Sequence, residues 1–396
     1  MHALRPVLAL TLLAGAAWAA DPVPPVYLLD APALMKARAG AHPAAVEKLR
    51  AEADGLLDLR PASVLDKAAA PASGDKHDYS SMGPYWWPDP AKPDGLPYIR
   101  RDGEVNPEAR RNSDSTAFSK TCRAIEVLGT AYFVTGEARY AQKAATLART
   151  WFLDPATRMN PNFQHAQAIP GLTTGRGIGL IEAQHLMRAN DGLALLAGAA
   201  AWTDADRAAM LAWNAEFYRW LTTSRNGLDE KGWHNNHGSW YDAQTAHLAL
   251  VVGRAEDARK ILTDGLQVRV ARQIEPDGRQ PHELERTRSL SYSIYNLEAL
   301  FTCARLAEQV GVDWWRFATP DGRSLGAALR YLAPYADPAK PWPKQDLEDA
   351  NRARLIPLLR AYLKRADDAE LRAILDQVAP QDRELPWRSL AEEYRG

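Results

Sequence analysis

Apolar residues recur every three or four positions along most of the chain, which is the spacing of one face of an α-helix. The pattern is clearest in residues 117–133, 138–152, 179–196, 204–221, 292–310 and 324–335. No stretch shows the sustained alternation of apolar and polar residues that an extensive sheet would require. The sequence therefore predicts an all-α fold.

Residues that favour helix ends lie at the borders of these segments. Asp114 and Thr203 precede two of the apolar runs, and Gly136, Gly253 and Gly311 follow others, where glycine commonly terminates a helix. About a dozen helices joined by short turns, without a heptad seam, favour a curved array of helical hairpins. We expect an incomplete α/α toroid that forms a single domain over residues 20–396.

Two segments interrupt the helical pattern and are unusually rich in aromatic and polar residues. Residues 76–101 contain five prolines, and residues 159–176 are rich in amides. Long loops in a compact helical domain are more often functional than decorative. By contrast, the chain from Asp313 onward has the pattern of ordinary amphipathic helix followed by a charged tail, and we expect no chemistry from it.

The N-terminus has the pattern of an export signal. His2 and Arg5 precede an apolar run that ends in Ala17-Trp18-Ala19, and residues 1–19 are the expected signal peptide. The apolar run is too short to span a bilayer, and no later stretch is long enough, so we expect no membrane insertion. The predicted location is the periplasm or, failing that, the extracellular medium.

The charge balance narrows the classes of possible partner, and the two cysteines bear on whether a disulfide forms. The chain has 48 Lys plus Arg against 49 Asp plus Glu, which gives no indication of a nucleic-acid partner or of a basic membrane-binding surface. An anionic ligand would need a local cluster of basic side chains. The two cysteines, Cys122 and Cys303, stand in apolar helical patterns, which favours buried thiols, although a single disulfide remains open.

The densest polar cluster lies at the start of an apolar helical run, in the segment from His234 to Asp242. It contains Asn235, Asn236 and His237, and side chains of this kind are costly to bury without partners. Such a cluster is typical of a cleft. A plain helix cap is one alternative, and a zinc site built on His234 and His237 is another, although no third ligand stands at metalloprotease spacing.

A second candidate segment contains Arg288 and, seven residues later, Tyr295. If the chain is helical from Ser291 onward, these two residues lie about two turns apart on approximately the same face. They are then able to point into one cavity. Taken alone, an exposed arginine and a core tyrosine would be the simpler interpretation.

Considered together, the two segments resemble the catalytic set of the alginate lyase family, which consists of helical-toroid polysaccharide lyases. The shared residues are Asn236, His237, Arg288 and Tyr295. The long loops resemble that family's cleft segments in His77-Asp78-Tyr79, in Gly83-Pro84-Tyr85-Trp86-Trp87-Pro88-Asp89-Pro90, in Met159-Asn160-Pro161-Asn162, and in Gln167 with Ile169-Pro170-Gly171. The Tyr-Trp-Trp-Pro-Asp-Pro version is closest to the branch that acts on alginate or glucuronan. Gly238-Ser239-Trp240 departs from the better-known alginate lyases.

The resemblance implies cleavage of a 4-linked polyuronate by β-elimination, and this chemistry suits the residue types. Asn236 and Arg288 would neutralise the carboxylate on C5, which acidifies the C5 hydrogen. Tyr295 would act as base and acid when C5–H and O4 share a face, whereas for guluronate His237 would be the base and Tyr295 the acid. No metal ion or other cofactor is expected, because side chains replace the cation.

Further residues are candidates for binding the anionic polysaccharide. Aromatic rings stack on sugar faces, and amides or guanidinium groups bind hydroxyls and carboxylates. The expected substrate-binding residues are Tyr85, Trp86, Trp87, Asn162, Gln167 and Arg176.

Two other functions remain open from the sequence alone. A glycoside hydrolase would need two carboxyl groups across the cleft, and Glu283, Glu285 and Asp242 are available for this role. A carbohydrate-binding protein without catalytic activity would use the aromatic loops for recognition only. The exact polymer, mannuronate, guluronate or glucuronate, is also left open, as are endo or exo action and the oligomeric state.

Overall fold

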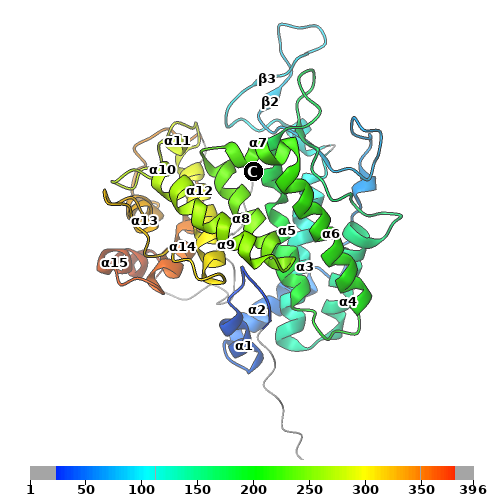
Figure 1. Ribbon diagram of the computed structural model, residues 1–396, viewed down its shortest axis with the longest axis horizontal. Coiled ribbons are helices and arrows are strands. Elements are labelled where there is room, and N and C mark those ends of the chain that lie inside the picture. Colours follow the sequence, from blue (N-terminus) through cyan, green and yellow to red (C-terminus); the bar gives the residue numbers. More distant parts are fainter. Residues whose placement is uncertain (1–23, 112, 348, 380–396) are drawn as a thin grey trace, which may run out of the picture.

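The computed structural model describes residues 24–111, 113–347 and 349–379, so the expected signal peptide lies outside the described residues. Regular structure is mostly helical (Figure 1), which confirms the predicted all-α fold. The α-helices are α1 (Ala31–Arg38), α2 (Pro43–Asp54), α3 (Ser115–Thr135), α4 (Ala138–Ala148), α5 (His185–Ala194), α6 (Asp204–Thr223), α7 (Arg225–Gly232), α8 (Asn236–Val251), α9 (Ala255–Gly265), α10 (Ala271–Gln273), α11 (Pro281–Leu284), α12 (Ser289–Glu308), α13 (Leu325–Leu332), α14 (Leu355–Leu363) and α15 (Ala369–Val378).

Shorter elements link these helices. The 3-10 segments are η1 (Val64–Asp66), η2 (Pro107–Arg110), η4 (Gly177–Gln184), η6 (Ala333–Ala336) and η7 (Arg352–Arg354), and the π-helical turns are η3 (Arg149–Leu153) and η5 (Leu266–Val270). The strands are β1 (Ser80–Met82), β2 (Trp86–Trp87), β3 (Ile99–Arg100) and β4 (His165–Ala168). They form two small sheets: β1 pairs with β4 in parallel, and β2 pairs with β3 antiparallel.

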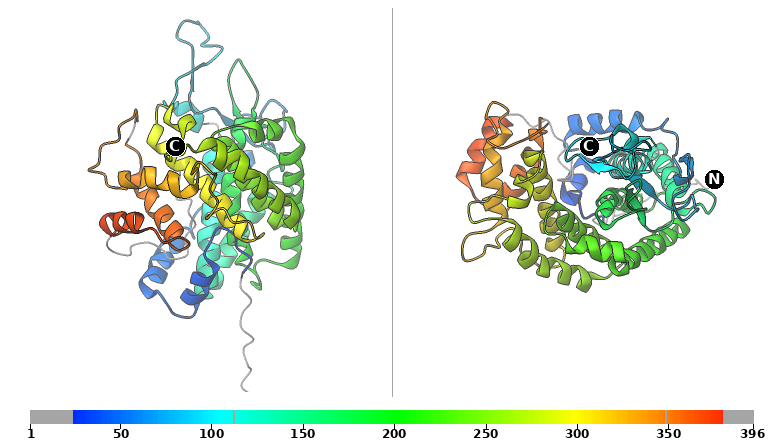
Figure 2. Two further views of the ribbon diagram at one scale, coloured as in Figure 1. Left: turned by 60° about the vertical axis from the view of Figure 1, so that its left-hand side comes forward. Right: turned by 90° about the horizontal axis from the view of Figure 1, so that it is seen from above.

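Seen from above, the helices form a curved double layer that does not close into a full ring (Figure 2), which is the incomplete toroid expected from the sequence. Helices α3, α5, α8 and α12 form the inner layer, in which α3 packs on α5 and α8 packs on α12. Outer helices pack against them, including α4 on α3, α9 on α8 and α13 on α12. The inner helices therefore surround the centre of the molecule.

Burial along the sequence explains which helices lie inside. In α8 and α12 nearly every residue is buried, including polar ones such as Ser239, Gln244 and Asn296. A helix that is buried on all faces has no polar stripe, whereas α4 and α9 alternate apolar and charged positions and bury one face only. Buried polar groups on the inner helices are available to line a site.

Two predicted helices differ from a regular α-helix in the structure. The run expected at 138–152 is α-helical only to Ala148 and then continues as the π-helical turn η3. The run expected at 179–196 begins as the 3-10 segment η4 and becomes α-helical at His185. Close packing accompanies this start, because a Cβ on Gly179 would lie 2.6 Å from the backbone of Ala166 in β4.

The expectations for the helix ends at Thr203 and Gly136 and for the buried cysteines are confirmed. Thr203 caps α6 through a reciprocal capping box with Asp206, and Gly136 ends α3 in the left-handed conformation, with φ of 75°. Cys122 and Cys303 are buried free thiols. Within the described ranges, no helix is both long and apolar enough to cross a membrane.

Candidate active site

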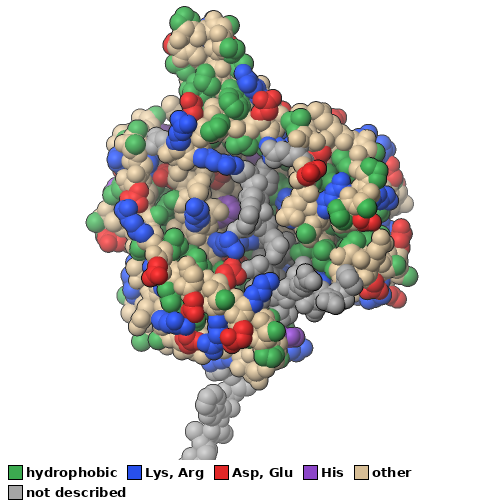
Figure 3. Space-filling view, turned by 180° about the vertical axis from the view of Figure 1, so that it is seen from behind, with side chains coloured by type: hydrophobic (Ala, Val, Ile, Leu, Met, Phe, Trp, Pro, Cys, Tyr) green, Lys and Arg blue, Asp and Glu red, His purple; other side chains and the backbone are tan. Residues whose placement is uncertain are grey.

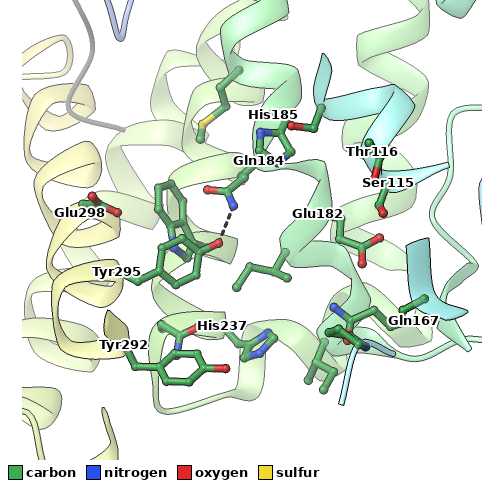
Figure 4. Close-up of a pocket in the computed structure, with 18 of the residues that line it drawn as sticks. Ser115, Thr116, Gln167, Glu182, Gln184, His185, His237, Tyr292, Tyr295 and Glu298 are labelled. Carbon is green, nitrogen blue, oxygen red and sulfur yellow. Dashed lines mark hydrogen bonds between the residues drawn. The ribbon is translucent and has the colours of Figure 1, made fainter. Parts of the chain in front are cut away.

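A large cleft with a volume of about 1140 Å³ opens at the centre of the inner helical layer. Side chains from α3, α5, α8 and α12 line it, together with residues of both long loops. The close-up in Figure 4 shows Tyr292 and Tyr295 reaching into it from α12 and His237 reaching in from α8. The cleft thus brings together the two segments that the sequence singled out.

His237 is held by a buried carboxylate. Its Nδ1 lies 2.9 Å from Oε1 of Glu230 on α7, and Glu230 is fully buried. A carboxylate at this distance favours the tautomer in which Nδ1 carries the hydrogen, so Nε2 is left with a free lone pair. Burial raises the pKa of Glu230, and the neighbouring imidazole of His237 acts against that rise. His237 is thereby prepared to accept a proton through Nε2.

Asn236 is fixed by a second buried carboxylate, that of Glu283 on α11. The backbone N–H of Asn236 donates to Oε1 over 2.7 Å, and its side-chain amide donates to Oε2 over 2.8 Å. Burial raises the pKa of Glu283 to about 7, although these bonds act in the opposite direction. One amide hydrogen of Asn236 remains for a ligand, and its buried Oδ1 has no hydrogen-bond partner among the described residues.

Tyr295 has its phenolic oxygen in the cleft and its ring packed in the core. The side-chain amide of Gln184, at the end of η4, donates a hydrogen bond to that oxygen, drawn as a dashed line in Figure 4. The Tyr295 ring lies 5.2 Å from the ring of Trp240, measured between centroids, and the residue is 5% exposed. This packing holds the phenol in one orientation.

Arg288 stands directly before α12 and is 7% exposed. Its backbone forms an isolated β-bridge with Asp346. Arg288 is not among the residues that line the cleft, whereas Arg286 is. Arg286 is bound to Asp102 over 2.7 Å, and its guanidinium carbon lies 3.9 Å from the centre of the Tyr292 ring. The cleft-lining arginine in this segment is therefore Arg286 rather than Arg288, which the sequence favoured.

Four of the six expected substrate-binding residues line the cleft, namely Tyr85, Trp86, Gln167 and Arg176. The hydroxyl of Tyr85 lies 2.6 Å from that of Tyr292. Arg176 donates to the side-chain oxygen of Gln167 over 2.8 Å and lies 5.7 Å from the centre of the Trp86 ring. Burial lowers the pKa of Arg176 to about 10, so the group stays cationic at neutral pH.

A glycine in the loop permits this arrangement. A Cβ on Gly83 would lie 2.7 Å from the Trp86 ring and 2.8 Å from the Arg176 guanidinium. Both distances are shorter than a Cβ atom normally shows, so glycine lets tryptophan and arginine lie this close to the backbone without shifting. The Gly83-Pro84-Tyr85-Trp86 motif therefore shapes one wall of the cleft.

Trp87 and Asn162 are not among the cleft-lining residues. The indole of Trp87 donates to the carbonyl of Glu104 over 3.0 Å, and Arg101 lies over its ring at 5.0 Å. Because successive residues of a strand point to opposite sides, Trp86 and Trp87 of β2 differ in this way. Asn162 donates to Asp78 over 3.0 Å, a contact within the loop region.

The residues considered for a zinc site or for a glycoside hydrolase differ from one another in their contacts. His234 packs edge-on against His282, with ring centroids 4.3 Å apart, and both line the cleft, as does Glu285. Asp242 is bound to the buried Arg269 over 2.7 Å. Among residues 24–111, 113–347 and 349–379, no group of three His, Cys, Asp or Glu side chains is arranged to hold a metal ion.

The outer surface carries mixed charge. On the face shown in Figure 3, basic and acidic side chains are interspersed, in keeping with the even totals of the sequence. The β2–β3 hairpin projects from the body at the top of the molecule (Figures 1 and 2) and exposes Leu96 and Ile99. It lies next to the 169–175 loop, because the N–H of Tyr98 donates to the carbonyl of Pro170.

Sequence reasoning missed the residues that support the candidate catalytic side chains. Gln184 and Arg354 lie in segments with ordinary helical patterns, whereas Glu230 lies in the stretch 226–236, which the sequence indicated as irregular and which contains part of α7. Nothing in the spacing of these three residues relates them to His237 or Tyr295. Arg354 comes from the region in which no chemistry was expected, yet its guanidinium carbon lies 5.7 Å from the centre of the Tyr295 ring. Only Glu283 had been noted, as a candidate hydrolase carboxyl.

Comparisons with known proteins agree with this architecture. A crystal structure of an alginate lyase from Bacteroides ovatus is 37% identical, with a TM-score of 0.87, covering 94% of this chain and 100% of that one. The crystal structure of alginate lyase A1-III from Sphingomonas species A1 is 19% identical, with a TM-score of 0.50. The match covers 82% of this chain and 88% of that one. A variant of A1-III complexed with a tetrasaccharide is 20% identical, with a TM-score of 0.52 and the same coverage.

The two A1-III structures share the fold at low identity, and no protein of curated function matches the sequence. The profile of the family described as alginate lyase matches residues 63–342. This match spans most of the chain, and the Bacteroides ovatus structure extends the likeness over nearly all of it. The chain therefore belongs to the alginate lyase family and is an all-α polysaccharide lyase.

Proposed function

We propose that this lyase cleaves a 4-linked polyuronate, alginate or the related glucuronan, by β-elimination, with Asn236, His237 and Tyr295 at the reacting sugar. The observation that supports this most strongly is that His237 and Tyr295 come from different helices and reach into one cleft, each bound to a buried or half-buried partner. A relative crystallised with a tetrasaccharide supports a saccharide ligand.

The first requirement of the reaction is to neutralise the carboxylate on C5. The free amide hydrogen of Asn236 suits this task, because Glu283 fixes the rest of the amide and leaves this donor preorganised. Preorganised donors stabilise the enolate-like charge that develops when the C5 proton leaves. A guanidinium is the natural second donor, since its fork matches a carboxylate.

Arg288 remains the arginine that the family resemblance implies, and Arg286 is added because its side chain lines the cleft. A guanidinium that contacts the carboxylate contributes directly to substrate binding, whereas one that only supports the wall contributes to folding. We therefore compare Arg286→Gln with Arg288→Gln. If one of these arginines contacts the carboxylate, its replacement should remove the greater part of kcat/KM and leave the thermal stability unchanged.

The proton transfers require a base for C5–H and an acid for O4. When both lie on one face of the sugar, as in mannuronate or glucuronate, the phenol of Tyr295 performs both steps. It takes the C5 proton as phenolate and returns a proton to the departing O4. When they lie on opposite faces, as in guluronate, Nε2 of His237 takes the C5 proton and Tyr295 donates to O4.

Product analysis on a panel of purified polyuronates tests this function. Elimination leaves a C4=C5 double bond conjugated to the carboxylate, which absorbs in the ultraviolet, whereas hydrolysis leaves a saturated sugar. We expect ultraviolet-absorbing oligosaccharides from mannuronate-rich alginate, guluronate-rich alginate or glucuronan. Saturated products, or no cleavage of any polyuronate, would overturn the proposal.

The predicted export remains a proposal of its own. We propose that residues 1–19 direct the protein to the periplasm and are removed there. Sequencing the N-terminus of protein recovered from the periplasmic fraction tests this. Periplasmic protein whose first residue is Ala20 supports the proposal. Protein that stays in the cytoplasm with its N-terminus intact contradicts it.

A further inference from the structure

The surroundings of Tyr295 contain two groups that favour a negative oxygen. The first is Gln184, whose amide donates a hydrogen bond to the phenolic oxygen. A phenol that accepts this bond does not need its own hydrogen to be satisfied, and phenolate accepts it more strongly than phenol does. Gln184 cannot ionise, so its donor is present at every working pH.

The second group is the guanidinium of Arg354, which lies over the Tyr295 ring at 5.7 Å. Arg354 is 5% exposed and is held by Glu298, which accepts from its Nε over 2.8 Å and from its Nη2. A cation over an aromatic face is attracted by the ring electrons, and the attraction grows when the ring carries the charge of a phenolate. Glu298 offsets part of this effect, so Gln184 carries the larger share.

We propose that Gln184, assisted by the Arg354–Glu298 pair, is a positioning residue that stabilises the phenolate form of Tyr295 and so lets it act as the base near neutral pH. The role in elimination rests on the proposed function, but the stabilisation itself does not. The other titratable or charged groups considered around Tyr295 are His237 of α8, His185 of α5, and Tyr292 and Glu298 of α12, all of which line the same cleft.

Gln184→Glu is the sharpest variant, because it keeps the size of the side chain and reverses the direction of the hydrogen bond. A carboxylate at this position accepts from the phenol and repels a phenolate. Gln184→Met removes the donor without adding charge. Gln142→Glu, on the exposed face of α4, adds the same charge far from the cleft and serves as the matched control.

Ultraviolet titration of tyrosinate, after subtraction of the same titration for Tyr295→Phe, reports the ionisation of Tyr295 without any substrate. We expect Gln184→Met to move the ionisation of Tyr295 upward by roughly one pH unit, and Gln184→Glu to move it further. The rising limb of the kcat/KM profile should move by the same amount on mannuronate-rich polymer. The Gln142→Glu control should show neither displacement.

Distinct outcomes separate the two proposals. If Tyr295 ionises at the same pH in wild type, Gln184→Met and Gln184→Glu, the positioning role is wrong, whatever the enzyme does to polyuronates. If the ionisation moves as expected but no polyuronate is cleaved, the proposed function fails and the positioning role stands. Should Gln184→Glu fail to fold, Gln184→Met alone decides, because it introduces no buried charge.

Discussion

The Nδ1 atom of His237 lies 2.9 Å from the carboxylate of Glu230, which is fully buried seven residues earlier in the chain. This contact relates a cleft side chain to α7, none of whose residues lines the cleft. It fixes which ring nitrogen carries the hydrogen and which faces the cleft. Replacing the carboxylate therefore tests the role of His237 without altering the imidazole itself.

Glu230→Gln should lower kcat on guluronate-rich polymer by roughly a hundredfold or more, because an amide no longer favours the tautomer with a free Nε2. The loss should be smaller on mannuronate-rich polymer, where Tyr295 serves as base. Steady-state kinetics on both polymers measure the two effects.

The adjacent residue supplies the control for that prediction. Asp229 is exposed, so Asp229→Asn makes the same chemical change without touching His237, and wild-type kinetics are expected. Equal losses of kcat in Glu230→Gln and Asp229→Asn would show that Glu230 acts through protein stability or through the overall charge of the region, and not through His237. An unaffected Glu230→Gln enzyme would remove His237 from the proton transfer.

The paired tryptophans of β2 offer a second test. Trp86 lines the cleft and Trp87 does not, although they are neighbours in sequence. Trp86→Ala should raise KM for polymer by roughly tenfold, because one stacking surface for a sugar face is lost. Trp87→Ala should leave KM near the wild-type value. A larger rise in KM for Trp87→Ala than for Trp86→Ala would contradict the placement of the sugar chain on this wall.

Stability should depend on pH through Glu283. Burial raises its pKa from 4.5 in a free side chain to about 7, so the folded protein binds this proton more tightly than the unfolded chain does. The free energy of unfolding therefore falls as the pH rises through this window, by at most about 1.4 kcal/mol per pH unit. Glu283→Gln cannot ionise, and its carbonyl oxygen keeps one of the two bonds from Asn236, so the loss of the other lowers stability equally at every pH. Its stability relative to wild type should rise with pH.

Urea unfolding of both proteins at about pH 5 and about pH 8 measures that difference. Burial also raises the pKa values of Glu182, Glu230 and Asp242, but these groups are common to both proteins and cancel in the comparison. A difference in stability that stays constant between the two pH values would contradict the account of Glu283.

Helical periodicity predicted the architecture well, because burying one face of each helix is a local constraint that leaves a repeating pattern. The cap at Thr203 and the terminal Gly136 were predictable for the same reason, since each satisfies helix-end geometry within a few residues. The 3-10 start at Gly179 was not, because it accompanies packing against β4, far away in sequence.

For the site, the sequence indicated the residues with distinctive chemistry and missed those that position them. Asn236, His237 and Tyr295 stand in recognisable motifs, and all three line the cleft. Gln184 contacts Tyr295 across 111 positions of sequence, so no local pattern reveals it. The alternation along β2 separates Trp86 from Trp87, but two residues are too few to show in a sequence which one faces inward.

The central claim is that the hydroxyl of Tyr295 transfers the protons of an elimination, and Tyr295→Phe tests it most directly. The variant, compared with a Tyr132→Phe control on α3, is assayed for ultraviolet-absorbing product and for binding of an oligo-uronate. We predict a loss of turnover of roughly a thousandfold or more with binding retained, because only the proton-carrying oxygen is removed. Product formation at the wild-type rate by Tyr295→Phe would contradict the mechanism.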